Sequence, residues 1–126
     1  MRSNLSVTMD LRAFADRWIS DWNRKDVDSV LSHFSEDVVF RSSRAKTVLG
    51  SPKVEGKCRL REYWTAAIAR IQTLRFSLDY VIGDGDRMGI VYIAEIDGKR
   101  MRAVEFLVFD SDGLVREGEA MYGIEL

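Results

Sequence analysis

Residues Arg102–Phe109 read Arg-Ala-Val-Glu-Phe-Leu-Val-Phe, an apolar run that is interrupted in its middle by one carboxylate, Glu105. Apolar residues at both alternating positions predict a β-strand that is covered on both faces. A buried carboxylate in such a strand is costly unless it is hydrogen-bonded, paired with a cation or used for a function. The surroundings of Glu105 therefore decide how this chain is interpreted.

Length and composition limit the classes of protein to consider. The 126 residues are 46% hydrophobic, which predicts one domain, residues 1–126, with a core of its own. The 19 basic and 20 acidic residues nearly cancel and are scattered, so we expect neither nucleic acid nor a membrane as a partner. With one cysteine and one histidine, the usual zinc patterns cannot be assembled, and we predict no metal and no cofactor. Without a signal peptide or membrane-spanning pattern, the expectation is a cytoplasmic protein.

Three segments have the apolar spacing of amphipathic helices. The first runs from Met9 to Asn23, with Thr8 as its predicted N-cap, and the second begins after Asp26, a second predicted N-cap. The third covers residues 60–71 and carries Tyr63 on its apolar face. His33 lies off the apolar stripe of the second segment, so we assign it no chemistry.

The remaining segments predict strands and one long loop. Residues 38–43 alternate as a strand, and residues 44–56, with the only proline, are expected to form an irregular loop at the rim of a site or a lid over it. From Phe76 onward the period changes to two, and Phe76, Leu78, Tyr80 and Ile82 are expected on one face. Further strands are predicted at residues 88–96, 99–110 and 114–123. The element order predicts an α+β fold with three helices on one face of a curved antiparallel sheet.

The turns between these strands predict which residues lie opposite Glu105. Asp97-Gly98 is a strong two-residue hairpin signal and places Ile90 opposite Glu105. A turn after Asp110 is expected to place Gly118 opposite Glu105 on the other side. One face of the sheet then carries Ile90, Tyr92, Ala94, Ala103, Glu105, Leu107, Gly118, Ala120 and Tyr122.

Small residues cluster around Glu105 on that face, which predicts a cavity rather than a filled core. Gly118 inside a strand is typical of a bulge or of a place where a ligand comes close. The opposite face carries Val91, Ile93, Val104, Phe106 and Val108, and no predicted helix is left to cover it. We therefore expect a homodimer through this outer face.

The order of several motifs resembles the SnoaL-like branch of the nuclear transport factor 2-like superfamily. The motifs are Trp18-Ile19-Ser20-Asp21-Trp22-Asn23, Asp26-Val27-Asp28, Phe34-Ser35-Glu36-Asp37-Val38-Val39-Phe40, Gly56 before Leu60-Arg61-Glu62-Tyr63-Trp64, and Glu105-Phe106 before Phe109-Asp110-Ser111-Asp112-Gly113. The resemblance covers nearly the whole chain. It implies a cystatin-like, cone-shaped fold, in which a bent sheet and three helices, packed on its concave face, surround a deep apolar pocket, commonly as a dimer.

Residue by residue, the resemblance to ketosteroid isomerase, a member of that superfamily, is partial. Glu105 falls where that enzyme keeps a protonated acid as an oxyanion donor. Ser42 stands at the position of its carboxylate base, and Trp18 at that of its oxyanion tyrosine. A serine without a basic partner is a poor proton acceptor, so steroid-type isomerisation by this route is disfavoured.

Two functions remain open from the sequence. In the first, Glu105 is a catalytic acid or base, and the chain is a cofactor-independent isomerase, cyclase or dehydratase that acts on a small hydrophobic carbonyl compound. In the second, the chain is a noncatalytic ligand-binding or dimerisation module, and Glu105 is a core acid hydrogen-bonded to Tyr92 or to the Trp18 indole. The residues expected to contact a small hydrophobic ligand are Trp18, Ser42, Tyr63, Tyr92, Gly118 and Tyr122.

Overall fold

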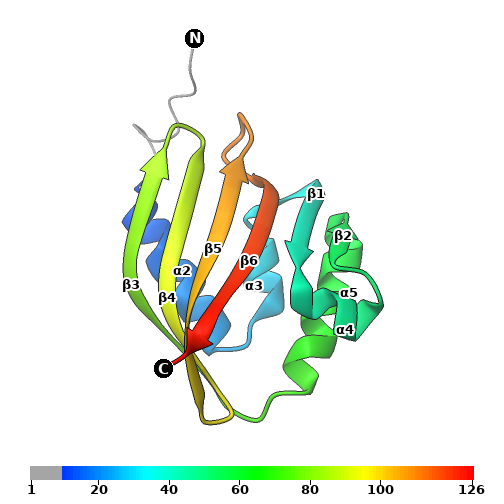
Figure 1. The fold of residues 1–126 in the computed structure, drawn as a ribbon. Helices are drawn as coiled ribbons and strands as arrows, with labels where there is room; N and C mark the ends of the chain where they lie inside the picture. Colours follow the sequence, from blue (N-terminus) through cyan, green and yellow to red (C-terminus); the bar gives the residue numbers. More distant parts are fainter. Residues whose placement is uncertain (1–9) are drawn as a thin grey trace.

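The computed structural model describes residues 10–126 as helices packed against a bent β-sheet (Figure 1). The elements in chain order are α2 Leu11–Asn23, α3 Val27–Leu31, β1 Phe34–Ser42, α4 Ser43–Leu49, β2 Lys53–Glu55, α5 Lys57–Ala69, β3 Leu74–Asp84, β4 Arg87–Ile96, β5 Lys99–Phe109 and β6 Val115–Glu125.

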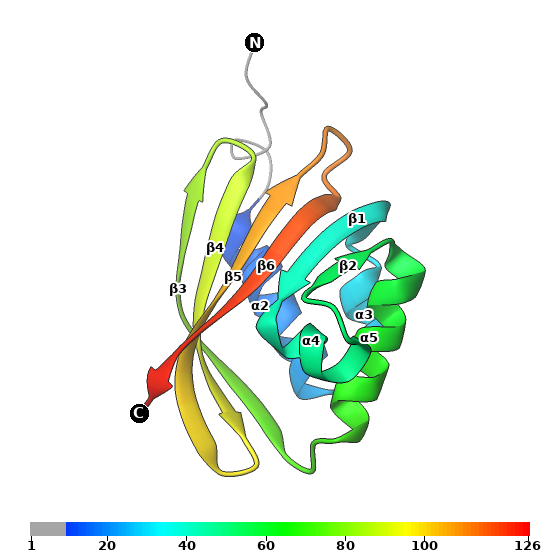
Figure 2. The same cartoon turned by 45° about the vertical axis from the view of Figure 1, so that its right-hand side comes forward.

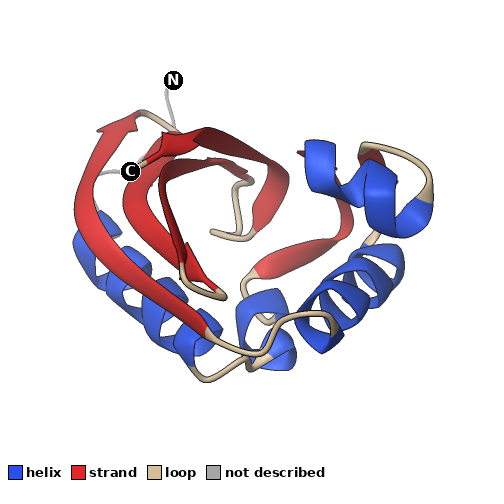
Figure 3. Cartoon of the chain, turned by 60° about the horizontal axis from the view of Figure 1, so that its bottom comes forward, coloured by secondary structure: helices blue, strands red, loops and turns tan. Residues whose placement is uncertain are grey.

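The six strands form one sheet in the order β2-β1-β6-β5-β4-β3. Neighbouring strands are antiparallel except β1 and β6, which pair in parallel. The sheet twists along its length (Figure 2) and bends round as a whole (Figure 3). The predicted α+β class is confirmed, although the sheet is not purely antiparallel.

The first two helices of the described residues, α2 and α3, begin at aspartate caps. Asp10 accepts a hydrogen bond from the backbone N–H of Ala13 at 3.0 Å and is the N-cap of α2. This corrects the prediction of Thr8, which lies outside the described residues. Asp26 caps α3 as predicted, through the N–H of Ser29 at 3.0 Å.

The predicted irregular loop at residues 44–56 is wrong. It contains α4 and β2, so the described chain has four helices rather than three. The Ser42 hydroxyl accepts from the N–H of Arg44 at 3.3 Å to cap α4, and Gly50 ends the helix at φ 89°. A serine before the segment and a glycine after it are the usual start and stop signals of a short helix. The proline lies beyond both.

The two hairpins around Glu105 differ in how well the sequence predicts them. In the β4–β5 hairpin, Asp97 and Gly98 both have positive φ, and Ile90 lies opposite Glu105 as predicted. In the β5–β6 hairpin, Ala120 rather than Gly118 lies opposite Glu105. Phe109 pairs with Val115, and the register then shifts so that Val108 pairs with Glu117. The pairing of β6 with β5 is therefore displaced by two residues from the predicted one. Because side chains along a strand alternate between the two faces, a displacement of two keeps every side chain on its predicted face.

Strand β3 also departs from simple alternation. Its pairing with β4 shifts between Leu78 and Tyr80, which changes the face of the residues that follow. Val81 packs against the core, whereas Tyr80 and Ile82 are 48% and 58% exposed. The prediction that Tyr80 and Ile82 share the face of Phe76 is therefore wrong.

The core lies between the inner face of the sheet and the helices. Its largest fully buried side chains come from α2, α3, α5 and three strands: Trp18, Phe34, Phe40, Leu31, Leu60, Met88, Ile90 and Leu107. None of the helices in residues 10–126 is both long and apolar enough to cross a membrane.

Candidate functional site

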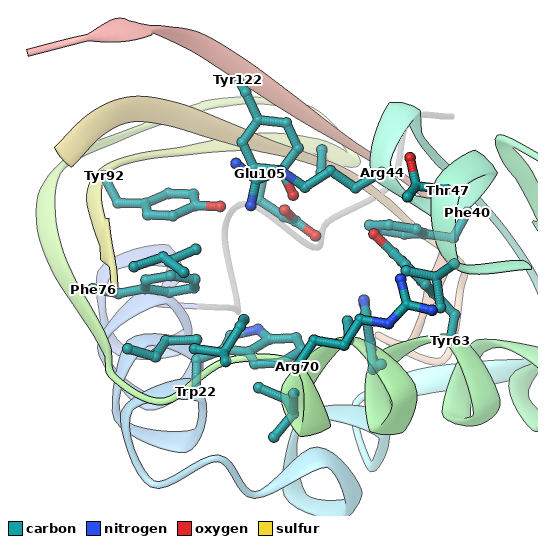
Figure 4. Close-up of a pocket in the computed structure, with 18 of the residues that line it drawn as sticks. Trp22, Phe40, Arg44, Thr47, Tyr63, Arg70, Phe76, Tyr92, Glu105 and Tyr122 are labelled. Atoms are coloured by element: carbon teal, nitrogen blue, oxygen red, sulfur yellow. The ribbon is translucent and has the colours of Figure 1, made fainter. Parts of the chain in front are cut away.

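A cavity of about 280 Å³ lies between the inner face of the sheet and helices α2, α4 and α5 (Figure 4). Its walls are mostly apolar, and its polar side chains are few. It is lined by Trp18, Trp22, Phe40, Arg44, Thr47, Val48, Tyr63, Trp64, Ala67, Ile68, Arg70, Ile71, Leu74, Phe76, Tyr92, Ile96, Glu105, Ala120 and Tyr122.

Aromatic rings form one continuous wall of the cavity. Trp18 and Trp22 are one helical turn apart on α2, so they lie on the same side of that helix. Phe76 stacks on Trp18 with ring centres 5.7 Å apart, and its centre lies 4.7 Å from that of Tyr92. Trp22 meets Trp64 of α5 edge to face at 5.0 Å. This packing holds the wall rigid and leaves flat apolar surface toward the cavity.

Glu105 is the one acid among the cavity-lining residues. Its side chain is 3% exposed and points into the cavity (Figure 4). No hydrogen bond or ion pair joins its carboxyl group to another of residues 10–126; in particular, neither Tyr92 nor the Trp18 indole bonds to it. Burial raises the pKa of Glu105 well above the usual 4.5. Burial therefore favours the neutral carboxylic acid, which has one O–H donor.

Three tyrosines surround this acid. Tyr92 of β4 is 2% exposed, Tyr63 of α5 is 3% exposed, and Tyr122 comes from β6. Burial raises the pKa of all three phenols above 10.0, and the nearby Arg44 guanidinium opposes that rise in each case. All three remain protonated near neutral pH, so they serve as hydrogen-bond donors and not as bases.

Ser42 acts on the site through Tyr63. Its hydroxyl lies 3.1 Å from the Tyr63 hydroxyl, and it also caps α4. It is buried but is not among the residues that line the cavity. Ser42 therefore holds Tyr63 and the start of α4 in place.

Two indole N–H groups at the site have no acceptor. The Nε1 atoms of Trp18 and Trp22 are buried without a hydrogen-bond partner among the described residues. Both rings make edge-to-face contacts, Trp18 with Tyr92 at 5.1 Å and Trp22 with Trp64 at 5.0 Å. Both N–H groups are therefore enclosed in the packed wall and do not add to the donors that are open to the cavity.

Two arginines lie at the cavity (Figure 4). Arg44 of α4 is half-buried, and its guanidinium carbon lies 4.1 Å from the centre of the Tyr122 ring. Arg70, directly after α5, is exposed. No group of three or more histidine, cysteine, aspartate or glutamate side chains able to hold a metal occurs in residues 10–126.

The structure brings five of the seven predicted site residues to one cavity: Trp18, Tyr63, Tyr92, Glu105 and Tyr122. Ser42 and Gly118 do not line it. A side chain at Gly118 would place its Cβ 2.8 Å from Cδ1 of Phe40, so this glycine makes room for the Phe40 ring and not for a ligand.

Arg44, Thr47 and Val48 were not predicted at the site, because residues 44–56 were expected to form an irregular loop. Ser42 and Gly50 were the signals that would have placed these side chains on a helix beside the cavity. Trp22 and Trp64 were not predicted at the site either, and they are both core and cavity wall.

Comparison with known proteins identifies relatives of the same fold. Residues 15–118 match the model of the SnoaL-like domain. A SnoaL-like protein of unknown function from Burkholderia thailandensis is 27% identical, with a TM-score of 0.81 over 90% of this chain and 93% of that one. An NTF2-like protein of unknown function from Burkholderia pseudomallei is 16% identical, with a TM-score of 0.77 over 91% and 92%.

A third similar structure contains a small molecule. It is TerC co-crystallised with polyporic acid, 16% identical to this chain, with a TM-score of 0.75 over 90% of this chain and 92% of that one. None of the curated proteins that were compared with the chain matches it.

Proposed function

The chain belongs to the SnoaL-like domain family, which confirms the resemblance drawn from its motifs, and on that premise we propose that its cavity binds a small, largely apolar carbonyl compound. The carbonyl oxygen of the ligand accepts a hydrogen bond from protonated Glu105. The aromatic wall of Trp22, Phe76 and Tyr92 packs against the apolar body of the ligand.

One observation carries this proposal: Glu105 is buried, faces the cavity and has no partner among residues 10–126. A buried polar group without a hydrogen bond costs free energy in a folded protein. A ligand oxygen that accepts from its O–H removes that cost. Since the three tyrosines near it are also donors, the polar atoms of a complementary ligand are acceptors.

The same carboxyl group can catalyse an acid–base reaction without a second residue. Its O–H gives a proton to the carbonyl oxygen of the ligand, while its other oxygen takes a proton from the carbon next to that carbonyl. The C=O bond becomes an enol C–O–H, a C=C bond forms, and Glu105 ends with one proton as it began. Isomerisation, cyclisation and dehydration of carbonyl compounds can all start from this enol.

This one-residue route fits the site better than a two-residue one. No second carboxyl group lines the cavity, and Ser42, at the position expected for a base, is bonded to Tyr63. The TerC structure lends support of a general kind, because that protein is crystallised with a small molecule in the same fold.

The probe for this proposal is α-tetralone, an apolar ketone with acidic hydrogens beside its carbonyl. Calorimetry tests whether it binds, and exchange of those hydrogens for deuterium tests catalysis. We expect the protein to bind α-tetralone in calorimetry and to speed deuterium uptake at the carbon next to the carbonyl, measured by NMR in D₂O. Glu105→Gln is expected to retain binding within a few fold and to lose the rate enhancement.

The alternative function, a noncatalytic binding module, predicts a different result. In that case α-tetralone binds equally to both proteins, and neither protein accelerates exchange. Absence of binding to the wild-type protein contradicts the proposed function itself.

We also infer that the outer face of the sheet packs against a second copy of the chain. In the rows across this face, Tyr80 pairs with Val91, Val91 with Val104, and Val104 with Met121. Tyr80 and Met121, at the two ends of this row, are 48% and 43% exposed, and large apolar side chains exposed on one face are typical of an interaction surface. A sheet-on-sheet dimer would cover them.

A further inference from the structure

We propose that the ligand of this cavity carries an anionic group, a carboxylate or the enolate of an acidic enol, that binds Arg44, with Arg70 as a second cation at the rim. The inference rests on the proposed function, because it names which carbonyl compounds the cavity takes. Their common feature is a pair of oxygens that shares one negative charge.

The charges at the cavity are unbalanced. Two arginines line it against one glutamate, and burial shifts that glutamate toward its neutral form. No carboxylate in the described part of the chain lies within 4.0 Å of the Arg44 or Arg70 guanidinium. The cavity therefore holds positive charge without an internal counterion, and an anionic ligand supplies one.

Arg44 is held in place by contacts that leave its charge intact. Its guanidinium stacks on the Tyr122 ring, with the carbon 4.1 Å from the ring centre, and one Nη donates to the Met101 sulfur at 3.4 Å. A ring face and a thioether sulfur orient the group but do not neutralise it. Most of the five N–H donors of Arg44 are left to bind a pair of oxygens on the ligand. Two such oxygens can accept parallel hydrogen bonds from one planar guanidinium group.

The position of Arg44 allows one small molecule to contact it and Glu105 together. Arg44 extends from α4 toward Tyr122, beside the Glu105 carboxyl group (Figure 4). The pKa values of Tyr63, Tyr92 and Tyr122 respond to both Arg44 and Glu105, which places all five groups around one space. Because Arg44 is half-buried, an ion pair there is screened less than one on the surface.

Calorimetry with two matched pairs of probes tests the inference on the whole chain. The carboxylate pair is β-naphthoate and neutral β-naphthamide, and the enolate pair is lawsone, ionised at pH 7, and its neutral methyl ether. We expect the anion of at least one pair to bind about tenfold or more tightly than its neutral partner. The pair that shows the preference identifies the anion as carboxylate or enolate.

Substitutions test whether Arg44 is the source of the preference for an anionic ligand. Arg44→Met keeps much of the packing of the side chain and is expected to weaken anion binding about tenfold or more, with neutral binding changed less than about threefold. Arg70→Met is expected to have the same effect to a smaller degree, because Arg70 is exposed. Arg75→Met is the control, since Arg75 is an exposed arginine that does not line the cavity.

A further measurement covers the case in which Arg44→Met does not fold. Raising NaCl from about 0.05 M to about 0.5 M is expected to weaken binding of the anionic probe to the wild-type protein and to leave the neutral probe unaffected. Arg44→Lys, which keeps the charge but loses the planar fork, is expected to retain part of the preference.

Two results contradict the inference in different ways. Neutral probes that bind as tightly as the anions, with no effect of Arg44→Met or of salt, overturn it and leave the proposed carbonyl-binding function standing. If neither the probes nor α-tetralone bind, the proposed function fails, and the inference fails with it.

Discussion

Ala120 of β6 lies directly opposite Glu105 of β5, and both residues line the cavity. Residues in this relationship have Cβ atoms about 4.5–5.5 Å apart. The small side chain of Ala120 is thus one reason that space exists beside the carboxyl group. A larger residue would take that space.

Ala120→Leu is expected to weaken binding of α-tetralone about tenfold or more, because the added atoms occupy the space beside Glu105. Calorimetry measures the loss, and thermal unfolding checks that the fold is retained. Met121→Leu is the control, since Met121 is the next residue along β6, is 43% exposed and points to the opposite face. Equal loss of binding in both variants would mean that the cavity is not the binding site.

Glu105→Gln is expected to change how stability depends on pH. The folded pKa of Glu105 is raised, so the folded state holds a proton that the unfolded state releases above about pH 4.5. The wild-type protein then loses stability as pH rises from the unfolded pKa to the folded pKa, by up to about 1.4 kcal/mol per pH unit. Glutamine mimics the protonated acid and has no such dependence.

Urea unfolding at several pH values between about 5 and 8 measures this difference. The stability of the variant relative to wild type should rise with pH over that range, until the folded pKa is passed. A difference that is constant with pH would show that Glu105 is ionised in the folded protein, and that its proposed role as a hydrogen-bond donor is wrong.

Gly118→Ala is expected to destabilise the fold by about 1–3 kcal/mol without filling the cavity. The added Cβ would lie 2.8 Å from Cδ1 of Phe40 and 3.3 Å from Cδ2 of Leu107, both in the core. Chemical denaturation measures the loss. Binding of α-tetralone to the folded protein should change little. If the variant were as stable as the wild-type protein but bound α-tetralone much more weakly, Gly118 would contact the ligand and this interpretation would be wrong.

Ser42→Ala is expected to cost about 0.5–2 kcal/mol, because it removes the N-cap of α4 and the partner of the Tyr63 hydroxyl. Ser43→Ala, at the exposed first residue of the same helix, is the matched control and should cost less than about 0.5 kcal/mol. Similar stability of the two variants would contradict the capping role of Ser42.

Met121→Lys is expected to separate the proposed dimer, because it places a charge on the outer face, at the exposed end of the row that begins at Tyr80. Sedimentation of the wild-type protein at micromolar concentration should give about twice the 14.4 kDa mass of the chain, and the variant should give one chain mass. Leu126→Lys, at an exposed apolar residue at the end of the chain, should leave the dimer intact. A wild-type protein that sediments as one chain contradicts the dimer.

The two hairpins show what limits prediction of register. Asp97-Gly98 allows one tight turn, because both residues take positive φ, and the pairing of β4 with β5 follows from counting. The turn between β5 and β6 is longer. In it the Asp110 carboxylate accepts hydrogen bonds from the backbone N–H groups of Asp112 and Leu114. The pairing of β5 with β6 also shifts by one residue beside this turn. Several turn geometries suit such an Asp-rich segment, so its register was predicted two residues away from the true one.

The cavity shows a second limit. Glu105, Tyr92 and Tyr122 were predictable on one face because alternation along a strand decides which side chains share a face. Arg44 and Arg70 were not, since they come from a helix and a helix end that only packing brings to the sheet. Their contacts depend on how α4 and α5 lie against β1, which no local pattern describes.

The sequence by itself determined the fold class, the family and the face on which each residue of Arg102–Phe109 lies, because these follow from local periodicity and from the order of motifs. The tertiary structure decided that the space beside Glu105 stays open, that its carboxyl group has no partner among residues 10–126, and that an arginine stacked on Tyr122 stands beside it. These features depend on distances between elements far apart in the chain, and such distances are set only when the helices pack on the bent sheet.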